Sequence, residues 1–321
     1  MQRVEAYGSC QVKLEESDVI EARVQTGVDV RLFATNLHAP SHMEWTQDGR
    51  LLVSEHTAGR IVDITAGGDF IDSKPFAWGL EGPSSILPLP NGQLLVAEMW
   101  RGRITDITNG GDLSTAPAFV DGLRNPYSLA MVDDNIYVVE RSGWSTTQVT
   151  MVMEKGRRVQ KPLVTNAPSL PMAGLEGLTP PSSWPDNWTE YFAGCSAWLT
   201  PLLLSGTHTL VMNNSPLGQF LAIPEHGGDY LTLAESGKVI ASGLSWMGGM
   251  YQRRSDERIF MTQPTKGTIV AIDPYANRDY RFDPPVVQGL NTPTCVRFGP
   301  DDEMLVCSIA TGGVWRISGN F

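Results

Sequence analysis

The sequence predicts an all-β fold, a six-bladed β-propeller with four-stranded antiparallel blades, and three observations predict it. A Leu-x-x-Pro segment recurs, and its prolines Pro40, Pro83 and Pro126 are spaced by 43 residues. Apolar runs bounded by Gly, Asp, Asn or Pro follow each proline, and such runs are strand signals. Gly and Pro number 32 and 22 among 321 residues, which indicates a chain rich in turns. A repeat of about 40 to 45 residues with four strands is typical of a propeller blade.

The elements of one repeat can be assigned in chain order. A first apolar strand follows the proline and ends at a polar turn such as Pro90-Asn91-Gly92. A second strand such as 93–98 follows, and a turn containing Gly leads to a third strand such as 103–107. A fourth, less regular run leads to the next Leu-x-x-Pro. The six units cover residues 37–65, 80–108, 123–152, a fourth between 154 and 243 whose second half is 207–223, 244–273 and 290–318.

The repeat also predicts that residues 1–321 form a single domain with a closed ring. Residues 1–36 precede the first repeat. The segment 28–37, which ends at the first residue of that repeat, resembles a fourth strand. We expect this strand to pair with the C-terminal strand at 314–318, because that pairing removes an open sheet edge. A Pro- and Trp-rich insertion over 154–206 is expected to enlarge the fourth blade.

Composition excludes some classes of partner. Net charge is −11, and no run of Lys and Arg stands out, which disfavours nucleic acid and anionic membranes. No run of 18 apolar residues is present, so no transmembrane helix is expected. We therefore expect a small organic substrate, and nothing in the pattern specifies an oligomeric state. The N-terminus lacks an apolar signal region, which favours a cytoplasmic protein and leaves a previously cleaved signal open.

Cysteine and histidine spacing predicts no metal site. The four cysteines, Cys10, Cys195, Cys295 and Cys307, are far apart and form no metal-type or Cys-x-x-Cys spacing. They are expected to be reduced, buried thiols. The five histidines show no zinc-binding spacing, so zinc is not expected. No cofactor is predicted, and a structural or catalytic divalent cation stays open.

One mouth of the channel is the predicted place for chemistry. The loop before each first strand and the turn after each second strand lie on the same face, because the chain crosses the antiparallel sheet twice between them. A ligand commonly binds at such a mouth. The candidate catalytic residues there are His42, His56, Glu98, Tyr127 and Glu140. The candidate substrate-binding residues are Arg124, Asn125, Arg141, Trp100, Trp144, Trp246, Gln263 and Lys266.

Structural roles compete with functional ones at several of these positions. Glu55, Glu98 and Glu140 recur at one place in the repeat. They form either a ring of metal-binding or basic carboxylates, or a set of groups that each cap their own Gly turn by accepting N–H bonds. Recurrence favours capping, since structural roles repeat with the fold. His42 is the leading candidate for a general base, and a histidine bonded to a backbone carbonyl is the alternative.

The repeat resembles a broad six-bladed superfamily that includes NHL repeats, the SMP-30/gluconolactonase group, streptogramin lyases and soluble PQQ-dependent glucose/sorbosone dehydrogenases. Local likeness is greatest to the dehydrogenases. Ser41-His42 and Glu55–Arg60 resemble their first-blade Pro-His pair and Glu-Arg-x-x-Gly-Lys turn. Gly122–Pro126 resembles their Gly-x-Arg-Asn-Pro motif, and Lys266-Gly267 their Lys-Arg-Gly segment. This resemblance implies PQQ contacts from Arg124, Asn125 and Lys266.

The chain departs from the dehydrogenases at their redox groups. Ser84-Ser85 stands where they have a catalytic His, Glu140–Ser145 where they have a calcium-binding acidic loop, and Asn291–Thr294 where they have an Arg pair. We therefore expect a cofactor-independent enzyme with acid–base chemistry, either a lyase, a lactone or ester hydrolase, or a cyclase. A PQQ-dependent sugar or alcohol dehydrogenase and a non-catalytic binding propeller are the alternatives, because propellers host all three classes.

Overall fold

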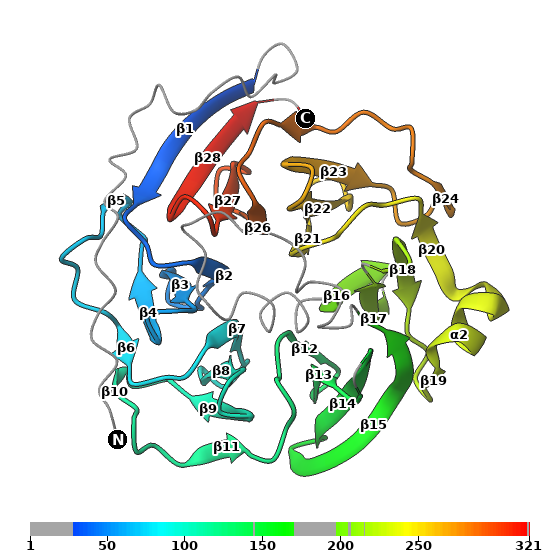
Figure 1. Cartoon of the computed structure of the whole chain (residues 1–321), viewed down its shortest axis with the longest axis horizontal. Helices are drawn as coiled ribbons and strands as arrows, with labels where there is room; N and C mark the ends of the chain where they lie inside the picture. Colours follow the sequence, from blue (N-terminus) through cyan, green and yellow to red (C-terminus); the bar gives the residue numbers. More distant parts are fainter. Residues whose placement is uncertain (1–27, 144, 170–196, 205–206, 215, 320) are drawn as a thin grey trace.

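Six β-sheets surround a central axis in the computed structural model, which describes residues 28–143, 145–169, 197–204, 207–214, 216–319 and 321 (Figure 1). The predicted six-bladed propeller is therefore confirmed. Within the described residues the helical structure amounts to α2 (Tyr230–Leu233) and a π-helical turn over Ala234–Lys238. No helix in these parts of the chain is long and apolar enough to cross a membrane.

Each blade has four main strands, and the innermost strand begins at or shortly after its Leu-x-x-Pro segment in blades 1, 2, 3 and 6. Blades 1 to 3 comprise β2 (Pro40–Trp45), β3 (Leu51–Glu55), β4 (Arg60–Asp63), β6 (Ala77–Trp78); β7 (Pro83–Pro88), β8 (Leu94–Glu98), β9 (Arg103–Asp106), β11 (Ala118–Val120); and β12 (Leu129–Val132), β13 (Asn135–Arg141), β14 (Thr146–Glu154), β15 (Arg157–Pro168). Blades 4 to 6 comprise β16 (Ala197–Leu204), β17 (Thr207–Asn214), β18 (Gln219–Ala222), β20 (Val239–Ser242); β21 (Met250–Gln252), β22 (Ile259–Gln263), β23 (Thr268–Ile272), β25 (Val287–Gln288); and β26 (Pro293–Phe298), β27 (Met304–Ser308), β28 (Gly313–Gly319), β1 (Val28–Thr35).

The ring closes as the sequence predicts. Strand β1 pairs antiparallel with β28, from Val28 opposite Gly319 to Ala34 opposite Val314. The N-terminal strand therefore completes the sheet of the C-terminal blade (Figure 1). The expected insertion over 154–206 begins differently, because its first part forms β15, the outer strand of blade 3. Residues 170–196 of that insertion lie outside the described residues.

The second strand of each blade lies in the middle of the core. All five residues of β3, β8, β22 and β27 are buried. Neighbouring blades cover both faces of these strands, and the apolar residues therefore form continuous runs instead of alternating with polar ones.

Four short parallel bridges tie each of four blades to the next one. A two-residue strand that follows the third strand of one blade pairs with the outer strand of the preceding blade. These bridges are β5 (Gly68–Asp69), β10 (Gly111–Asp112), β19 (Gly228–Asp229) and β24 (Arg278–Asp279). The chain approaches its neighbour so closely that a Cβ on Gly67 or Gly110 would lie 2.7 or 2.4 Å from a backbone oxygen. Both residues also have positive φ, so glycine is required there.

A second set of links surrounds the axis, and we call it the collar. Each link is a hydrogen bond from one blade to a backbone carbonyl of the next, and together they connect all six blades. The bonds run from a donor in one blade to a backbone carbonyl oxygen in the next. The pairs, donor first, are Ser54 and Ser84, Ser84 and Tyr127, Ser128 and Leu199, Asn213 and Gly248, the Gly249 N–H and Thr294, and Thr294 and Pro40. The side-chain donors are buried, so each bond satisfies a polar group that would otherwise be left without a partner.

Candidate functional site

A cavity of about 490 Å³ lies in the middle of the ring. The innermost strands of all six blades contribute to its wall, through residues that include His42, Ser85, Leu129, Leu199, Met250 and Arg297. We call the face that carries the Leu-x-x-Pro loops the proline face, and the face that carries the turns between first and second strands the hairpin face. Exposed Arg254 and Glu257, which also line the cavity, belong to a turn of the hairpin face. The cavity thus extends toward the face opposite to the predicted mouth.

His42 is the predicted catalytic residue that lines this cavity. Its side chain, on β2, is 2% exposed. Its Nδ1 lies 3.3 Å from Ser41 Oγ, and its ring meets the Tyr127 ring edge-on with centroids 4.9 Å apart. Burial, then the charges of Arg297 and His56, hold the pKa of His42 well below its ordinary value of 6.5. The imidazole is therefore neutral at pH 7, and Tyr127, itself buried, fixes one side of it.

Arg297, Glu44 and Tyr251 also line the cavity, and none of the three was predicted from the sequence. Arg297 of β26 forms an ion pair with Glu44 of β2, with Nε and Nη2 at 2.9 and 2.8 Å from the same carboxylate oxygen. The Arg297 guanidinium also lies 5.0 Å from the centre of the Tyr251 ring of β21. Glu44 follows His42 by two residues, which is the spacing of side chains on one face of a strand. That spacing could have identified Glu44, whereas the partner from blade 6 depends on the closed ring.

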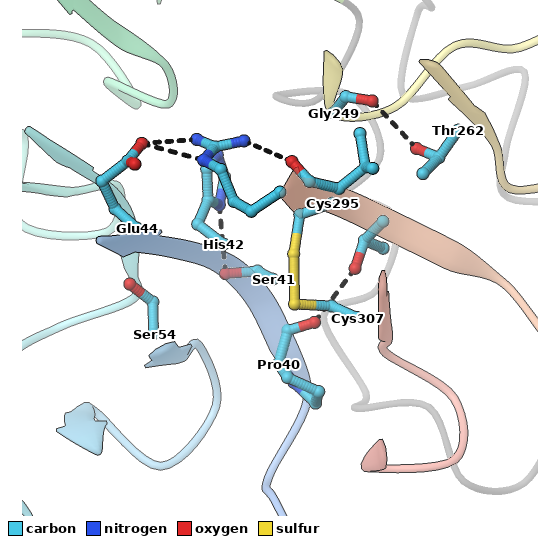
Figure 2. The surroundings of a disulfide bond; sticks show 12 residues. Pro40, Ser41, His42, Glu44, Ser54, Gly249, Thr262, Cys295 and Cys307 are labelled. Carbon is cyan, nitrogen blue, oxygen red and sulfur yellow. Dashed lines mark hydrogen bonds and ion pairs between the residues drawn. A yellow bond between two sulfur atoms is a disulfide. The ribbon is translucent and has the colours of Figure 1, made fainter. Parts of the chain in front are cut away.

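A disulfide lies beside β2 and corrects one expectation. Cys295 and Cys307, predicted to be reduced thiols, are joined across β26 and β27 with their Cα atoms 5.1 Å apart. Figure 2 shows the bond next to the stretch of β2 that carries Pro40, Ser41 and His42. The prediction was wrong because it considered only spacing along the chain. The hairpin register places these two residues directly opposite each other, although 12 positions separate them in sequence.

A second pocket, of about 390 Å³, opens on the proline face between blades 2 and 3. It brings together four predicted substrate-binding residues, Trp100, Arg124, Asn125 and Arg141, and adds Arg101. No carboxylate is among the described residues that line it. Arg101 forms an ion pair with Glu81 at 2.9 Å, so the cationic character of the pocket comes from Arg124 and Arg141.

His56 lies behind this pocket rather than in it. Its side chain is fully buried, its Nδ1 lies 3.1 Å from the Pro83 carbonyl oxygen, and its ring meets Trp100 edge-on at 4.7 Å. Burial lowers the pKa of His56 to about 4, against the opposing effect of the Pro83 contact. A neutral His56 therefore supports Trp100 from below and lies close enough to His42 to influence its pKa.

The recurring glutamates hold the entering loops. Glu98 is fully buried, and its carboxylate accepts hydrogen bonds from the Glu81 N–H at 2.8 Å, from Arg103 at 2.6 Å and from the Thr105 hydroxyl. Glu140 accepts equivalent bonds from the Arg124 N–H and the Thr150 hydroxyl.

Glu55 repeats this arrangement with the His38 N–H and Arg60. The backbone donors belong to the Leu-x-x-Pro loop of each blade rather than to the Gly turn that the capping interpretation named. Among the described residues no group of three His, Cys, Asp or Glu side chains could hold a metal ion.

The remaining candidates lie apart from the cavity. Trp246 packs against a core cluster that includes Met247 and Tyr127. Gln263 is buried and accepts a hydrogen bond from Thr268 at 3.0 Å, while Lys266 is exposed on the turn that follows β22. Trp144 lies outside the described residues.

Comparison with known proteins adds a fold-level relationship. No protein-family model matches the chain, and no curated protein matches its sequence. Among solved structures, a gluconolactonase from Xanthomonas campestris is 11% identical over 91% of this chain and 90% of its own, with a TM-score of 0.55. An auxiliary nutrient binding protein from Bacteroides ovatus is 11% identical over 92% and 78%, with a TM-score of 0.57. A streptogramin B lyase is 11% identical over 92% and 98%, with a TM-score of 0.49. The chain therefore shares its overall fold with this gluconolactonase and this nutrient binding protein.

Proposed function

We propose that this protein is a small-molecule enzyme that hydrolyses a lactone or ester by acid–base chemistry in the central cavity, with His42 as the proton-transferring group. The observation that carries the proposal is the position of His42, a buried, neutral imidazole in the wall of a cavity of about 490 Å³. That volume falls within the range of about 300–1,000 Å³ that small ligands occupy. The fold shared with a gluconolactonase gives support of a general kind.

The environment of His42 affects the two halves of such a reaction in opposite ways, because a lowered pKa weakens the imidazole as a base and strengthens the imidazolium as an acid. A neutral imidazole can accept the proton of a water molecule as the water attacks the carbonyl carbon. The imidazolium that forms is a stronger acid than an ordinary imidazolium, because burial and then Arg297 lower its pKa. It therefore returns the proton readily to the alkoxide that leaves when the carbon–oxygen bond breaks. Tyr127 and Ser41, which contact the ring, keep it oriented during both transfers.

The replacement His42→Ala tests the proposal. We expect kcat/KM on a panel of small lactones and esters to fall at least about 100-fold, because the proton-transfer group is lost. The control is His226→Ala, which removes an exposed histidine that does not line the cavity. Unchanged turnover by a folded His42→Ala variant would remove His42 from the chemistry, and equal losses in both variants would indicate a general defect.

Quinone-dependent oxidation is a second candidate, favoured by one observation. Arg124 and Asn125, which match the PQQ-contacting motif, lie in the cationic pocket with Arg141. The pocket lining fits the acid groups of such a quinone but not a calcium ion, whose protein sites are built around carboxylates. A rise in Tm on addition of PQQ with Ca²⁺ would favour the dehydrogenase, since a ligand stabilises only the state that binds it. The hydrolase proposal expects no rise.

A further inference from the structure

The hairpin of β14 and β15 is the longest in the described part of the chain and forms the outer side of blade 3 (Figure 1). A tight turn at Lys155-Gly156, with φ of 47° and 79°, joins the strands. The Lys155 N–H donates to Asn135 Oδ1 at 3.0 Å. Two further contacts join the hairpin to blade 2: Gln160 donates to the Asp121 carbonyl at 2.6 Å, and Arg158 lies 4.8 Å from the Phe119 ring centre. The hairpin is thus held in one conformation.

This hairpin concentrates positive charge in an acidic protein. Residues 155–161 contain Lys155, Arg157, Arg158 and Lys161 and no acidic residue, while the whole chain has a net charge of −11. The adjoining Glu154 pairs with Lys161 at 2.9 Å. In the described structure the exposed side chains of Lys155 and Arg157 form no ion pair. Val159 and Gln160 interrupt the basic residues, so the segment does not form a continuous run of Lys and Arg in the sequence.

The outer edge of β15 is largely open. Of its 12 residues, Val164 and Thr165 pair with β19 on that side, and no described strand pairs with the outer edge of Arg157–Leu163. An open edge presents unpaired backbone N–H and carbonyl groups that can bind another extended chain. On β15 this edge reaches as far as Lys161, because Pro162 has no N–H. The edge that carries the positive charge is therefore also the edge that can accept a strand.

Protection against aggregation alone does not account for this excess of charge. Charged residues on an edge strand commonly prevent edge-to-edge pairing. Strand β1 is the comparable long outer strand of blade 6, and its outer edge is likewise paired at two residues, Ala34 and Thr35. On β1 the exposed charges Arg31 and Asp29 form an ion pair of 2.7 Å and cancel. One outer strand of this ring is thus electrically balanced, whereas β15 is not.

We propose that the β14–β15 hairpin is a docking surface for an acidic, extended segment of a partner protein. The segment adds a strand to the outer edge of β15, and its carboxylates face Lys155 and Arg157. Backbone hydrogen bonds supply affinity in this mode, and charge supplies selectivity. The surface lies on the outside of the ring, so docking leaves the central cavity accessible.

Fluorescence anisotropy with a labelled, alternating Glu-Thr peptide of about ten residues tests the docking surface. We expect the unchanged protein to bind this peptide and the K155E/R157E variant to bind at least about tenfold more weakly, with affinity falling as salt rises. Neither residue packs against the body of the protein, so the variant should keep its fold. The matched control is K74E/K238E, which makes the same change in charge at exposed positions on other blades.

Three outcomes would overturn the proposal. The peptide fails to bind the unchanged protein, both double variants lose affinity equally, or heparin and anionic vesicles bind the hairpin while the peptide does not. Amide hydrogen exchange gives the structural readout, because strand addition should slow exchange within 157–161. Activity of the central cavity should be unchanged in K155E/R157E, so failure here is separate from failure of the proposed hydrolase.

Discussion

At the scale of single residues, the positions that differ between repeats are the ones that can carry out chemistry. His42, Ser85 and Ser128 stand 43 residues apart, and all three line the cavity. Because only one of these three equivalent positions is a histidine, the fold of the blade does not require a histidine there. The glutamates at 55, 98 and 140 recur in the first three repeats, and each holds a loop in place.

Replacing Glu98 should therefore damage stability more than catalysis. In Glu98→Gln the buried Arg103 guanidinium loses its charged partner, and breaking a buried ion pair costs about 3–5 kcal/mol. Urea unfolding measures this loss, with Glu81→Gln as control. Glu81 pairs with Arg101 at the half-exposed surface, where such a pair is worth about 1 kcal/mol or less. Normal stability combined with lost turnover would instead make Glu98 a catalytic residue.

At this scale, sequence reasoning located several residues that depart from their repeat, and their roles in substrate binding stay predictions. It placed Trp100, Arg124, Asn125 and Arg141 on one face, and the structure brings them into one pocket. It did not find Arg297 and Tyr251, because their approach to β2 depends on the closed ring. The Cys295–Cys307 bond was missed for a related reason, since strand register rather than chain spacing brings the sulfurs together.

At the scale of elements, three of the four short parallel bridges contain an aspartate that holds the adjoining turn and whose pKa is lowered. Asp69 accepts hydrogen bonds from Asn36 and the Ile71 N–H, Asp112 from the Ser114 N–H, and Asp229 from Asn166. These bonds lower the pKa of each carboxyl from its ordinary value of 3.8. A carboxyl whose folded pKa is depressed stabilises the fold fully above its ordinary pKa, and that contribution is lost as pH falls through the folded pKa.

The triple variant D69N/D112N/D229N tests this dependence. We expect it to unfold at lower urea concentration than the unchanged protein near neutral pH. Below the ordinary aspartate pKa of 3.8 the difference should shrink, because the unchanged protein then loses the same interactions. A gap in the urea midpoints that stays constant as the pH falls would contradict a role for the ionised carboxylates.

The elements differ in how well the sequence predicts them. The first three strands of most repeats follow directly from apolar runs and turn residues. Bridges of two residues such as Gly68–Asp69 leave no periodic signal, because their partner is a strand of another blade. The length of β15 was obscured for a similar reason, since a polar, half-exposed outer strand resembles an insertion.

At the scale of the whole molecule, one strand from the N-terminal side holds the ring shut. Deletion of residues 1–36 removes β1, leaves an edge of β28 unpaired, and uncovers the core cluster against which Val28, Val30 and Leu32 pack. We expect calorimetry of the deletion variant to show a broad transition in place of a single cooperative one. A synthetic peptide of residues 28–36 should restore the sharp transition. A sharp melt without the peptide would contradict closure by β1.

The ring as a whole was the most predictable level. The spacing of the prolines predicts the blades, and the apolar segment 28–37 predicts the strand that closes the ring. The direction in which the cavity opens was not predictable, because it depends on side chains that narrow or widen the axis at each level. The sequence makes both His42 and His56 candidates for the site. Only the packing in the folded protein shows that His42 lines the cavity and that His56 lies against the Pro83 carbonyl.

The hydrogen bonds of the collar run in one direction around the ring. Each blade donates on one side and accepts on the other, so the contact between neighbouring blades is heterologous, as between head-to-tail subunits of an assembly. Heterologous contacts form a closed ring only when successive rotations return to the start. The protein is in this respect a cyclic hexamer whose subunits share one chain. Within such symmetry the contacts between blades do not by themselves mark any one blade as the first in the ring.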